Sequence, residues 1–175
     1  MTVSTTPLSR QHPGPDVSSA EIFIRELEAG DDFMAFRTLN EEWITQHFAL
    51  EPKDIQTLAD PETAILGKGG HIYLASAGHS PVGCVALLPM GDGVFELSKM
   101  AVTPAMRGRG IGRRLLQHAI EAARLLGGRA LFLGSSTRLP DAIHLYEAVG
   151  FRHLAAEEIP DLAYSRADVF MRLVL

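Results

Sequence analysis

The spacing of apolar residues along the chain predicts alternating strands and helices. Short apolar runs bounded by turn residues indicate strands, which we place at residues 21–27, 71–77, 82–89, 94–102, 130–134 and 167–175. Apolar residues that recur at helical spacing predict helices, which we place at residues 33–48, 52–59, 111–126 and 141–149. The short, glycine-containing connections around residues 79 and 92 predict antiparallel hairpins. The pattern is typical of an α/β (α+β) domain with a mixed sheet.

Length and composition favour one domain. The chain has 175 residues, 46% of them hydrophobic, which is enough for one sizeable core, and we expect a single domain over residues 20–175. Residues 1–19 are rich in Ser, Thr and Pro and lack the apolar segment of a signal peptide, so we expect a disordered leader there. Cys84 is the single cysteine and stands in an apolar run, where we expect a small buried side chain.

Several protein classes are disfavoured by the same sequence. A formal net charge of −5 argues against non-specific nucleic-acid binding, and no run approaches the roughly 18 apolar residues of a membrane span. With one cysteine and no targeting segment, we expect a cytoplasmic protein without a membrane partner. The seven histidines show no pairing at metal-ligand spacing, so no metal is predicted. The segment GSSTR at 134–138 lacks the second glycine of a nucleophile elbow.

A glycine- and arginine-rich segment separates the strand at 94–102 from the helix that begins at residue 111. Unpaired backbone N–H groups at a helix start favour an anion, glycines allow it close approach, and arginines add charged donors. The segment therefore predicts a diphosphate or polyphosphate site formed by Arg107, Gly108, Arg109, Gly110, Ile111, Gly112, Arg113 and Arg114. A flexible basic turn followed by a solvated helix start is the alternative.

Two other phosphate motifs fit this segment less well. A Walker loop requires Gly-Lys followed by Ser or Thr, which the segment lacks. A dinucleotide fingerprint requires glycine where Arg113 stands, and an acidic residue after the next strand, which instead ends in GSS.

The run RGRGIG resembles the acyl-coenzyme-A binding loop of the GNAT N-acetyltransferase superfamily. That loop has Arg or Gln, two residues, Gly, one residue, and then Gly or Ala, which correspond here to Arg107, Gly110 and Gly112. An acidic residue in the preceding strand, the segment AIHLYEAVGF at 142–151 and a closing strand follow in the family's order. The resemblance covers residues 21–175.

The resemblance implies a specific fold and a specific co-substrate, acetyl-CoA. The fold is a twisted, mostly antiparallel sheet of six to seven strands, splayed at the fourth and fifth strands and flanked by about four helices. The pantetheine arm of the coenzyme would lie in the gap, bonded by the backbone of Met100, Ala101 and Val102 as by an added strand. Many family members have asparagine just after the strand, where this chain has Ser135 and Ser136. We expect these two residues to bind the coenzyme, since a hydroxyl can make one of the same hydrogen bonds but lacks the second donor of an amide.

Glu96 is the candidate general base, acting directly or through water. It is the acidic residue of the strand at 94–102 and occupies the place of the family's glutamate. Strict alternation would put Glu96 on one face with Ser98 and Met100, opposite Leu97 and Lys99. An ordinary exposed strand glutamate is the alternative interpretation.

Tyr146 matches the family's tyrosine near the sulfur, where its hydroxyl can protonate the departing thiolate. Packing of this tyrosine in the core is the alternative. The backbone N–H of Met100 or Ala101 is the candidate for polarising the acyl carbonyl.

The acceptor is expected to be a primary amine. The segments at 41–54 and 155–168 would supply acceptor specificity in this family, and both contain several carboxylates. They lead to the hypothesis of a small cationic amine attracted by an acidic entrance. A protein or peptide acetyltransferase and a non-catalytic acyl-CoA-binding module are the alternatives, and the family resemblance also makes a homodimer possible.

Overall fold

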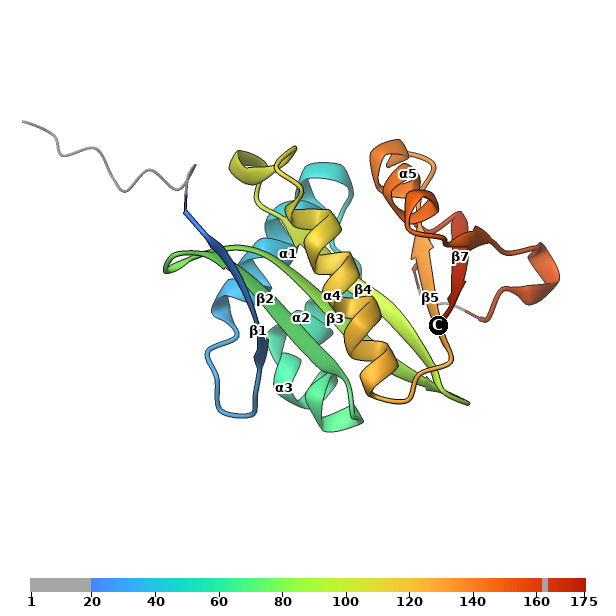
Figure 1. The fold of residues 1–175 in the computed structure, drawn as a ribbon, viewed down its shortest axis with the longest axis horizontal. Helices are drawn as coiled ribbons and strands as arrows, with labels where there is room; N and C mark the ends of the chain where they lie inside the picture. The colour runs from blue at the N-terminus through green and yellow to red at the C-terminus, as the bar shows by residue number, and fades with distance from the viewer. Residues whose placement is uncertain (1–19, 162–163) are drawn as a thin grey trace, which may run out of the picture.

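One mixed sheet organises the part of the chain that this computed structural model describes, residues 20–161 and 164–175 (Figure 1). Seven strands of these residues run in the order β1-β2-β3-β4-β5-β7-β6. Their bounds are β1 (Ile22–Leu27), β2 (His71–Ala77), β3 (Ser80–Gly91), β4 (Val94–Val102), β5 (Ala130–Ser135), β6 (Arg152–His153) and β7 (Val169–Val174). The leader predicted for residues 1–19 lies outside the described residues.

Helices cover both faces of the sheet. Figure 1 shows α4 (Ile111–Leu125) in front of the central strands, with α1 (Met34–His47), α2 (Pro52–Ala59) and α3 (Pro61–Ala64) behind them. The fifth helix, α5 (Pro140–Ala148), packs against the same core cluster as α4. The helical spacing of apolar residues explains the burial of α4, whose inner face consists of Ile111, Leu115, Leu116, Ala119, Ile120 and Ala123.

The sheet opens between β4 and β5. These parallel strands pair only through Val94, Phe95 and Glu96 with residues 130–132, after which β5 pairs with β7 alone. Residues 97–102 therefore present an edge without a partner on the β5 side, within the described chain. This confirms the mixed sheet and its splay at the fourth and fifth strands.

Strand β4 contains one extra residue opposite β3. Ser98 pairs with Ala86, and Ala101 pairs with Cys84. Two residues of β4, 99 and 100, therefore lie opposite the single residue 85 of β3. Lys99 lies in this bulge with a φ of 51°, a left-handed conformation that a lysine rarely adopts.

The bulge makes the predicted alternation along β4 wrong. Met100 packs in the α4-side core with Leu97, whereas Lys99 pairs with Asp54 on the opposite side of the sheet. Because an extra residue shifts the two-residue period, Lys99 faces the same side as Glu96 and Met100 does not.

The other elements match the predicted order, with three differences. Strand β3 extends beyond the predicted 82–89, and the sequence patterns missed both the two-residue β6 and the four-residue α3. None of the helices among the described residues is long and apolar enough to cross a membrane.

Gly83 of β3 lies close under Leu115 of α4. A Cβ added there would lie 2.9 Å from Leu115 Cδ1 and 3.0 Å from the Ala101 carbonyl oxygen. We expect Gly83→Ala to lower the free energy of unfolding by about 1–3 kcal/mol, because the added methyl overpacks this contact. Urea denaturation measures the change.

Gly67→Ala is the matched control. A Cβ at Gly67 meets its nearest neighbour, the Glu62 carbonyl oxygen, at an ordinary 3.5 Å, so the change should stay within about 0.5 kcal/mol. Equal effects of the two substitutions would contradict the close approach of α4.

Candidate active site

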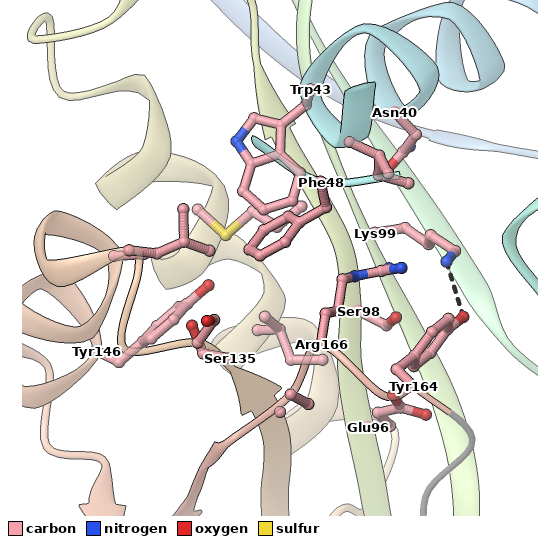
Figure 2. A pocket seen from close by; sticks show the side chains of 18 residues that line it. Asn40, Trp43, Phe48, Glu96, Ser98, Lys99, Ser135, Tyr146, Tyr164 and Arg166 are labelled. Carbon is pink, nitrogen blue, oxygen red and sulfur yellow. Dashed lines mark hydrogen bonds between the residues drawn. The ribbon is translucent and has the colours of Figure 1, made fainter. Parts of the chain in front are cut away.

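A pocket lies where β4 and β5 part, between α1, α5 and residues 164–168, the segment that precedes β7 (Figure 2). Both predicted catalytic residues line it, and its walls combine aromatic, apolar and charged side chains. The lining residues are Asn40, Trp43, Ile44, Phe48, Glu96, Leu97, Ser98, Lys99, Met100, Gly134, Ser135, Ser136, Leu139, Ala142, Tyr146, Tyr164, Arg166 and Ala167.

Glu96 comes from the last position of β4 that pairs with β5. Burial raises the pKa of its carboxyl group, and the nearby charges of Lys53 and Lys99 oppose that rise. A carboxylate with a raised pKa is a stronger base than an exposed glutamate. Glu96 is therefore not an ordinary exposed strand glutamate.

Tyr146 lies on the α5 side of the pocket, across from Glu96 and Tyr164 (Figure 2). Its ring also packs on Phe151, with ring centroids 5.8 Å apart, so the residue combines a core contact with a place in the pocket. Burial raises the pKa of the Tyr146 phenol to about 12. The group is therefore protonated at neutral pH and can donate a hydrogen bond.

Ser135 and Ser136 both line the pocket but differ in their surroundings. The Ser136 side chain is buried in the turn after β5, where its hydroxyl accepts a hydrogen bond from the backbone N–H of Arg138 (3.3 Å). The Ser135 hydroxyl makes no hydrogen bond among the described residues, so it is the better placed of the two to bond a ligand.

The glycine-arginine loop leads into a helix start with exposed backbone donors. Gly108 and Gly110 have φ values of 73° and 76°, which glycine adopts without strain. Gly110 is the N-cap of α4, no side chain caps the helix there, and its first turn contains no acidic residue. The first helical N–H groups, starting at Ile111, lack partners within the helix and can bind an anion.

The arginines of this loop have different surroundings. Arg107 donates through Nε to the Val102 carbonyl (3.1 Å) and through Nη2 to Gln46 Oε1 (2.9 Å), which ties the loop to β4 and α1. Arg114 donates to the Ile22 carbonyl of β1 (2.9 Å). Arg109 and Arg113 have exposed side chains.

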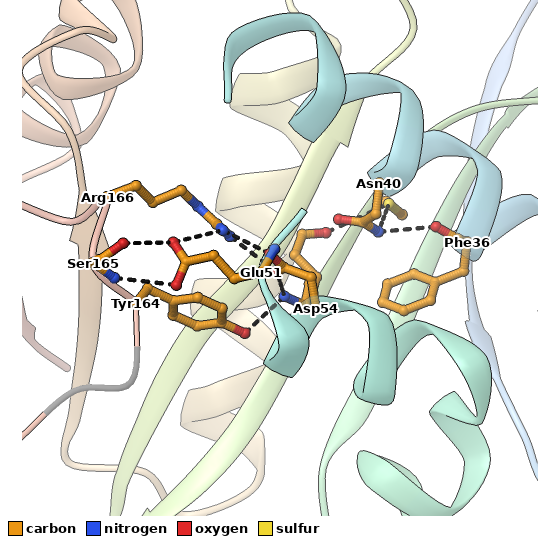
Figure 3. Close-up of polar contacts among 9 residues, drawn as sticks. Phe36, Asn40, Glu51, Asp54, Tyr164, Ser165 and Arg166 are labelled. Carbon is orange, nitrogen blue, oxygen red and sulfur yellow. Dashed lines mark hydrogen bonds and ion pairs between the residues drawn. The ribbon is translucent and has the colours of Figure 1, made fainter. Parts of the chain in front are cut away.

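A buried charge network borders the side of the pocket that faces α2 and was not predicted from the sequence (Figure 3). Asp54 of α2, whose side chain is 0% exposed, accepts hydrogen bonds from Arg166 at 2.6 and 3.0 Å and from Lys99 at 2.7 Å. Lys99 also donates to the Tyr164 hydroxyl at 2.8 Å. Glu51 accepts from the backbone and side chain of Ser165, both at 3.2 Å.

The network fixes the ionisation of Asp54. Burial alone would raise the pKa of this carboxyl group, but hydrogen bonds from Arg166, Lys99 and the Glu51 backbone lower it to about 2. The charged form is therefore strongly favoured in the folded protein. Nothing in the spacing of residues 54, 99 and 166 indicated this contact, since three separate elements bring them together.

The chain belongs to the GNAT acetyltransferase family. The model of the acetyltransferase (GNAT) family matches residues 33–151. The N-acetyltransferase YjgM of Escherichia coli is 29% identical over 139 residues, which cover 75% of this chain and 82% of that protein. The chain is accordingly an acyltransferase.

Solved structures share the fold. An acetyltransferase of the GNAT family from Staphylococcus aureus superposes with a TM-score of 0.77 at 21% identity, covering 87% of this chain and 98% of that one. A Bacillus subtilis acetyltransferase in complex with CoA gives a TM-score of 0.66 at 25% identity, covering 89% and 99% of the two chains. Within the described residues, no group of three or more His, Cys, Asp or Glu side chains is placed to hold a metal ion.

Removal of the Asp54 charge tests the buried network. We expect Asp54→Asn to lower the free energy of unfolding by about 3–5 kcal/mol, because it leaves Lys99 and Arg166 without their buried counter-charge. Chemical denaturation at pH 7 measures the loss. Glu41→Gln is the control, since Glu41 forms an exposed ion pair with Arg37 that contributes about 0.5 kcal/mol or less.

The same network predicts a pH dependence. A carboxylate whose pKa falls from 3.8 to about 2 on folding contributes stability above pH 4, on the order of 2 kcal/mol, that is lost as the pH falls from about 4 to 2. This loss of stability between about pH 4 and 2 should be absent in Asp54→Asn. Identical acid unfolding of the two proteins would contradict the network.

Gly112 tests the anion site. A Cβ there would lie 3.5 Å from Met100 Cε and 3.7 Å from Leu145 Cδ2, which are ordinary contacts, so the fold accommodates a small side chain. We expect Gly112→Val to raise the dissociation constant of CoA at least tenfold, with Gly112→Ala intermediate, because the side chain obstructs the first turn of α4. Titration calorimetry measures binding, and thermal unfolding checks the fold. An unchanged dissociation constant would place the diphosphate site elsewhere.

Proposed function

We propose that this protein transfers an acetyl group from acetyl-CoA to a small primary amine by direct attack in a ternary complex. The observation that carries the proposal is the pocket itself, which is lined by a half-buried carboxylate, Glu96, a protonated phenol, Tyr146, and the unpaired edge of β4. These groups are those that aminolysis of a thioester requires.

The coenzyme would lie along the gap between β4 and β5. Its pantetheine arm would bond the backbone of Met100, Ala101 and Val102, as an added strand does. Its diphosphate would lie at the loop and first turn at 107–114, where Gly108 and Gly110 keep the backbone open. Ser135 would bond the arm from β5. The related Bacillus subtilis structure that contains CoA supports a coenzyme site in this fold.

Glu96 would take the proton of the incoming amine. For an amine with a pKa of about 10.4, the neutral form at pH 7 lies roughly 5 kcal/mol above the ammonium. Burial raises the pKa of Glu96 and so improves it as a proton acceptor. Glu96 is the carboxylate that lines the pocket among the described residues, which favours it over the other acids as the base.

Transfer then needs one bond made and one broken. The neutral nitrogen attacks the acetyl carbonyl carbon, and the backbone N–H of Met100 or Ala101 would stabilise the oxyanion. The carbon–sulfur bond breaks as the carbonyl re-forms, and Tyr146 would give its proton to the leaving thiolate. A thiol of pKa about 8.5 leaves readily, so Glu96 should matter more than Tyr146.

The surroundings of the pocket support a small acceptor. Hydrogen bonds from Ser165 and Arg166 to Glu51 and Asp54 hold the segment before β7 against α2, which favours an enclosed site over an open peptide groove. The hypothesis of a cationic acceptor drew on carboxylates that include Glu51 and Asp54. Both are paired with Arg166, so their charge is largely neutralised.

Replacing the base tests the proposal. We expect Glu96→Gln to lower kcat by two to four orders of magnitude, in the range of general-base contributions, with the dissociation constant of CoA unchanged. Thiol release from acetyl-CoA across a panel of primary amines measures turnover. In the wild-type protein, kcat/KM should rise with pH through a pKa above the ordinary glutamate value, because burial raises the pKa of Glu96.

Glu121→Gln is the control. Glu121 is exposed on α4, and its loss should leave both turnover and the pH profile unaltered. An unchanged rate in Glu96→Gln would remove Glu96 as the base. No thiol release with any amine, in a protein that binds CoA, would contradict the proposed activity.

A further inference from the structure

The charged lining of the pocket is predominantly cationic. Among the described residues that line it, the charged side chains are Glu96, Lys99 and Arg166. Asp54, which pairs with both cations, is 0% exposed and lies behind them, outside the lining. A bound molecule can therefore contact Arg166, whose side chain is 18% exposed, more readily than Lys99, whose side chain is 4% exposed. Asp54 and Glu51 balance the charges of Lys99 and Arg166, so a ligand is selected here by hydrogen bonds more than by net charge.

Ser98, Lys99, Tyr164 and Arg166 form one wall of the pocket. Three N–H or O–H groups of this wall have no hydrogen-bond acceptor among the described residues. The Tyr164 hydroxyl accepts from Lys99, but its own proton has no acceptor in the described part of the chain. The terminal nitrogens of Arg166 bond Asp54 and Glu51, whereas its Nε bonds no described residue. The Ser98 hydroxyl also has no partner among residues 20–161 and 164–175. All three residues line the pocket, and the unpartnered Arg166 Nε and Ser98 hydroxyl are not buried, since no buried side-chain polar atom of the described residues lacks a partner.

These donors are held in place before any ligand binds. Arg166 is fixed by its two bonds to Asp54 at 2.6 and 3.0 Å, and Lys99 by its bond at 2.7 Å. The Tyr164 ring packs against both cations, with Arg166 Cζ 4.5 Å and Lys99 Nζ 4.8 Å from its centroid. Preorganised donors lose little entropy when they bind an anion, so this wall is suited to an anionic group.

Resting on the proposed acetyl transfer, we infer that the acceptor is a primary amine that also carries a carboxylate, as an amino acid does. The carboxylate bonds Tyr164 and Arg166 near Lys99, while the amine lies toward Glu96, which removes its proton. Trp43 and Phe48 line the neighbouring wall (Figure 2) and pack against the apolar part of the acceptor. The carboxylate of the substrate thus supplies the hydrogen-bond acceptor that these donors lack.

Matched acceptors test this inference. Thiol release is measured with α- and ω-amino acids, with their amides, and with the amines that lack the carboxylate. The series varies the distance between nitrogen and carboxylate. At least one amino acid should exceed its own amide and its decarboxylated amine tenfold or more in kcat/KM, because two charge-assisted hydrogen bonds are lost with the carboxylate.

Three substitutions assign the preference to this wall. Arg166→Gln should reduce the ratio of kcat/KM for the acid over the amide at least tenfold, and Arg166→Lys should restore part of it. Tyr164→Phe removes the hydroxyl, keeps the ring on the cations, and should reduce the ratio several-fold. Thermal unfolding and CoA binding establish that each variant is folded. If Arg166→Gln does not fold, Tyr164→Phe still decides the result.

The outcomes separate this inference from the proposed activity. Acetylation of amides and decarboxylated amines at rates equal to or above those of the acids would overturn the carboxylate preference and leave acetyl transfer standing. An acid preference that survives in Arg166→Gln and Tyr164→Phe would overturn this assignment of the wall. Absence of thiol release with every acceptor would overturn both proposals together.

Discussion

The short parallel pairing of β4 with β5 is the constraint on which the rest of the structure depends. Three residues on each strand pair before the strands part, and the separation leaves backbone donors and acceptors of β4 facing an open gap. In a closed sheet those groups would bond a neighbouring strand. Here the open edge lies beside Glu96, and a coenzyme arm of extended shape can satisfy it.

A buried carboxylate organises the opposite side of the pocket. Asp54 holds Lys99 of the β4 bulge and Arg166 of the segment before β7 in one network (Figure 3). An ion pair of this kind stabilises the fold modestly overall, but the loss of one partner is costly because the remaining charges stay buried. Its structural effect is to fix the position of two cations and a tyrosine relative to Glu96. One side of the pocket is thus preorganised by electrostatics, and the other presents an open strand edge.

The fold was largely predictable from the sequence because local patterns determine most of it. The helical spacing in α4 and the hairpins between β2, β3 and β4 are local signals, and the motif at 107–112 identified the family. Glu96 and Tyr146 were found by their place in that motif order, and both line the pocket. Their catalytic roles remain predictions.

The features that escaped prediction depend on contacts between distant residues. The bulge at Lys99 shifts the alternation of β4, and no residue type in that strand marks it, since a lysine occupies the left-handed position usually taken by glycine. The pairing of Asp54 with Arg166 joins α2 to the residues that precede β7. Glu51 and Asp54, two of the carboxylates that suggested an acidic entrance, are paired with Arg166.

The crystal structure of the protein with CoA bound is the most direct test of the central claim that the gap between β4 and β5 is the coenzyme site. The account predicts that the pantetheine arm hydrogen-bonds the backbone of residues 100–102 and that the diphosphate contacts the N–H groups at the start of α4. A coenzyme bound elsewhere, with the β4 edge still unpaired, would contradict it.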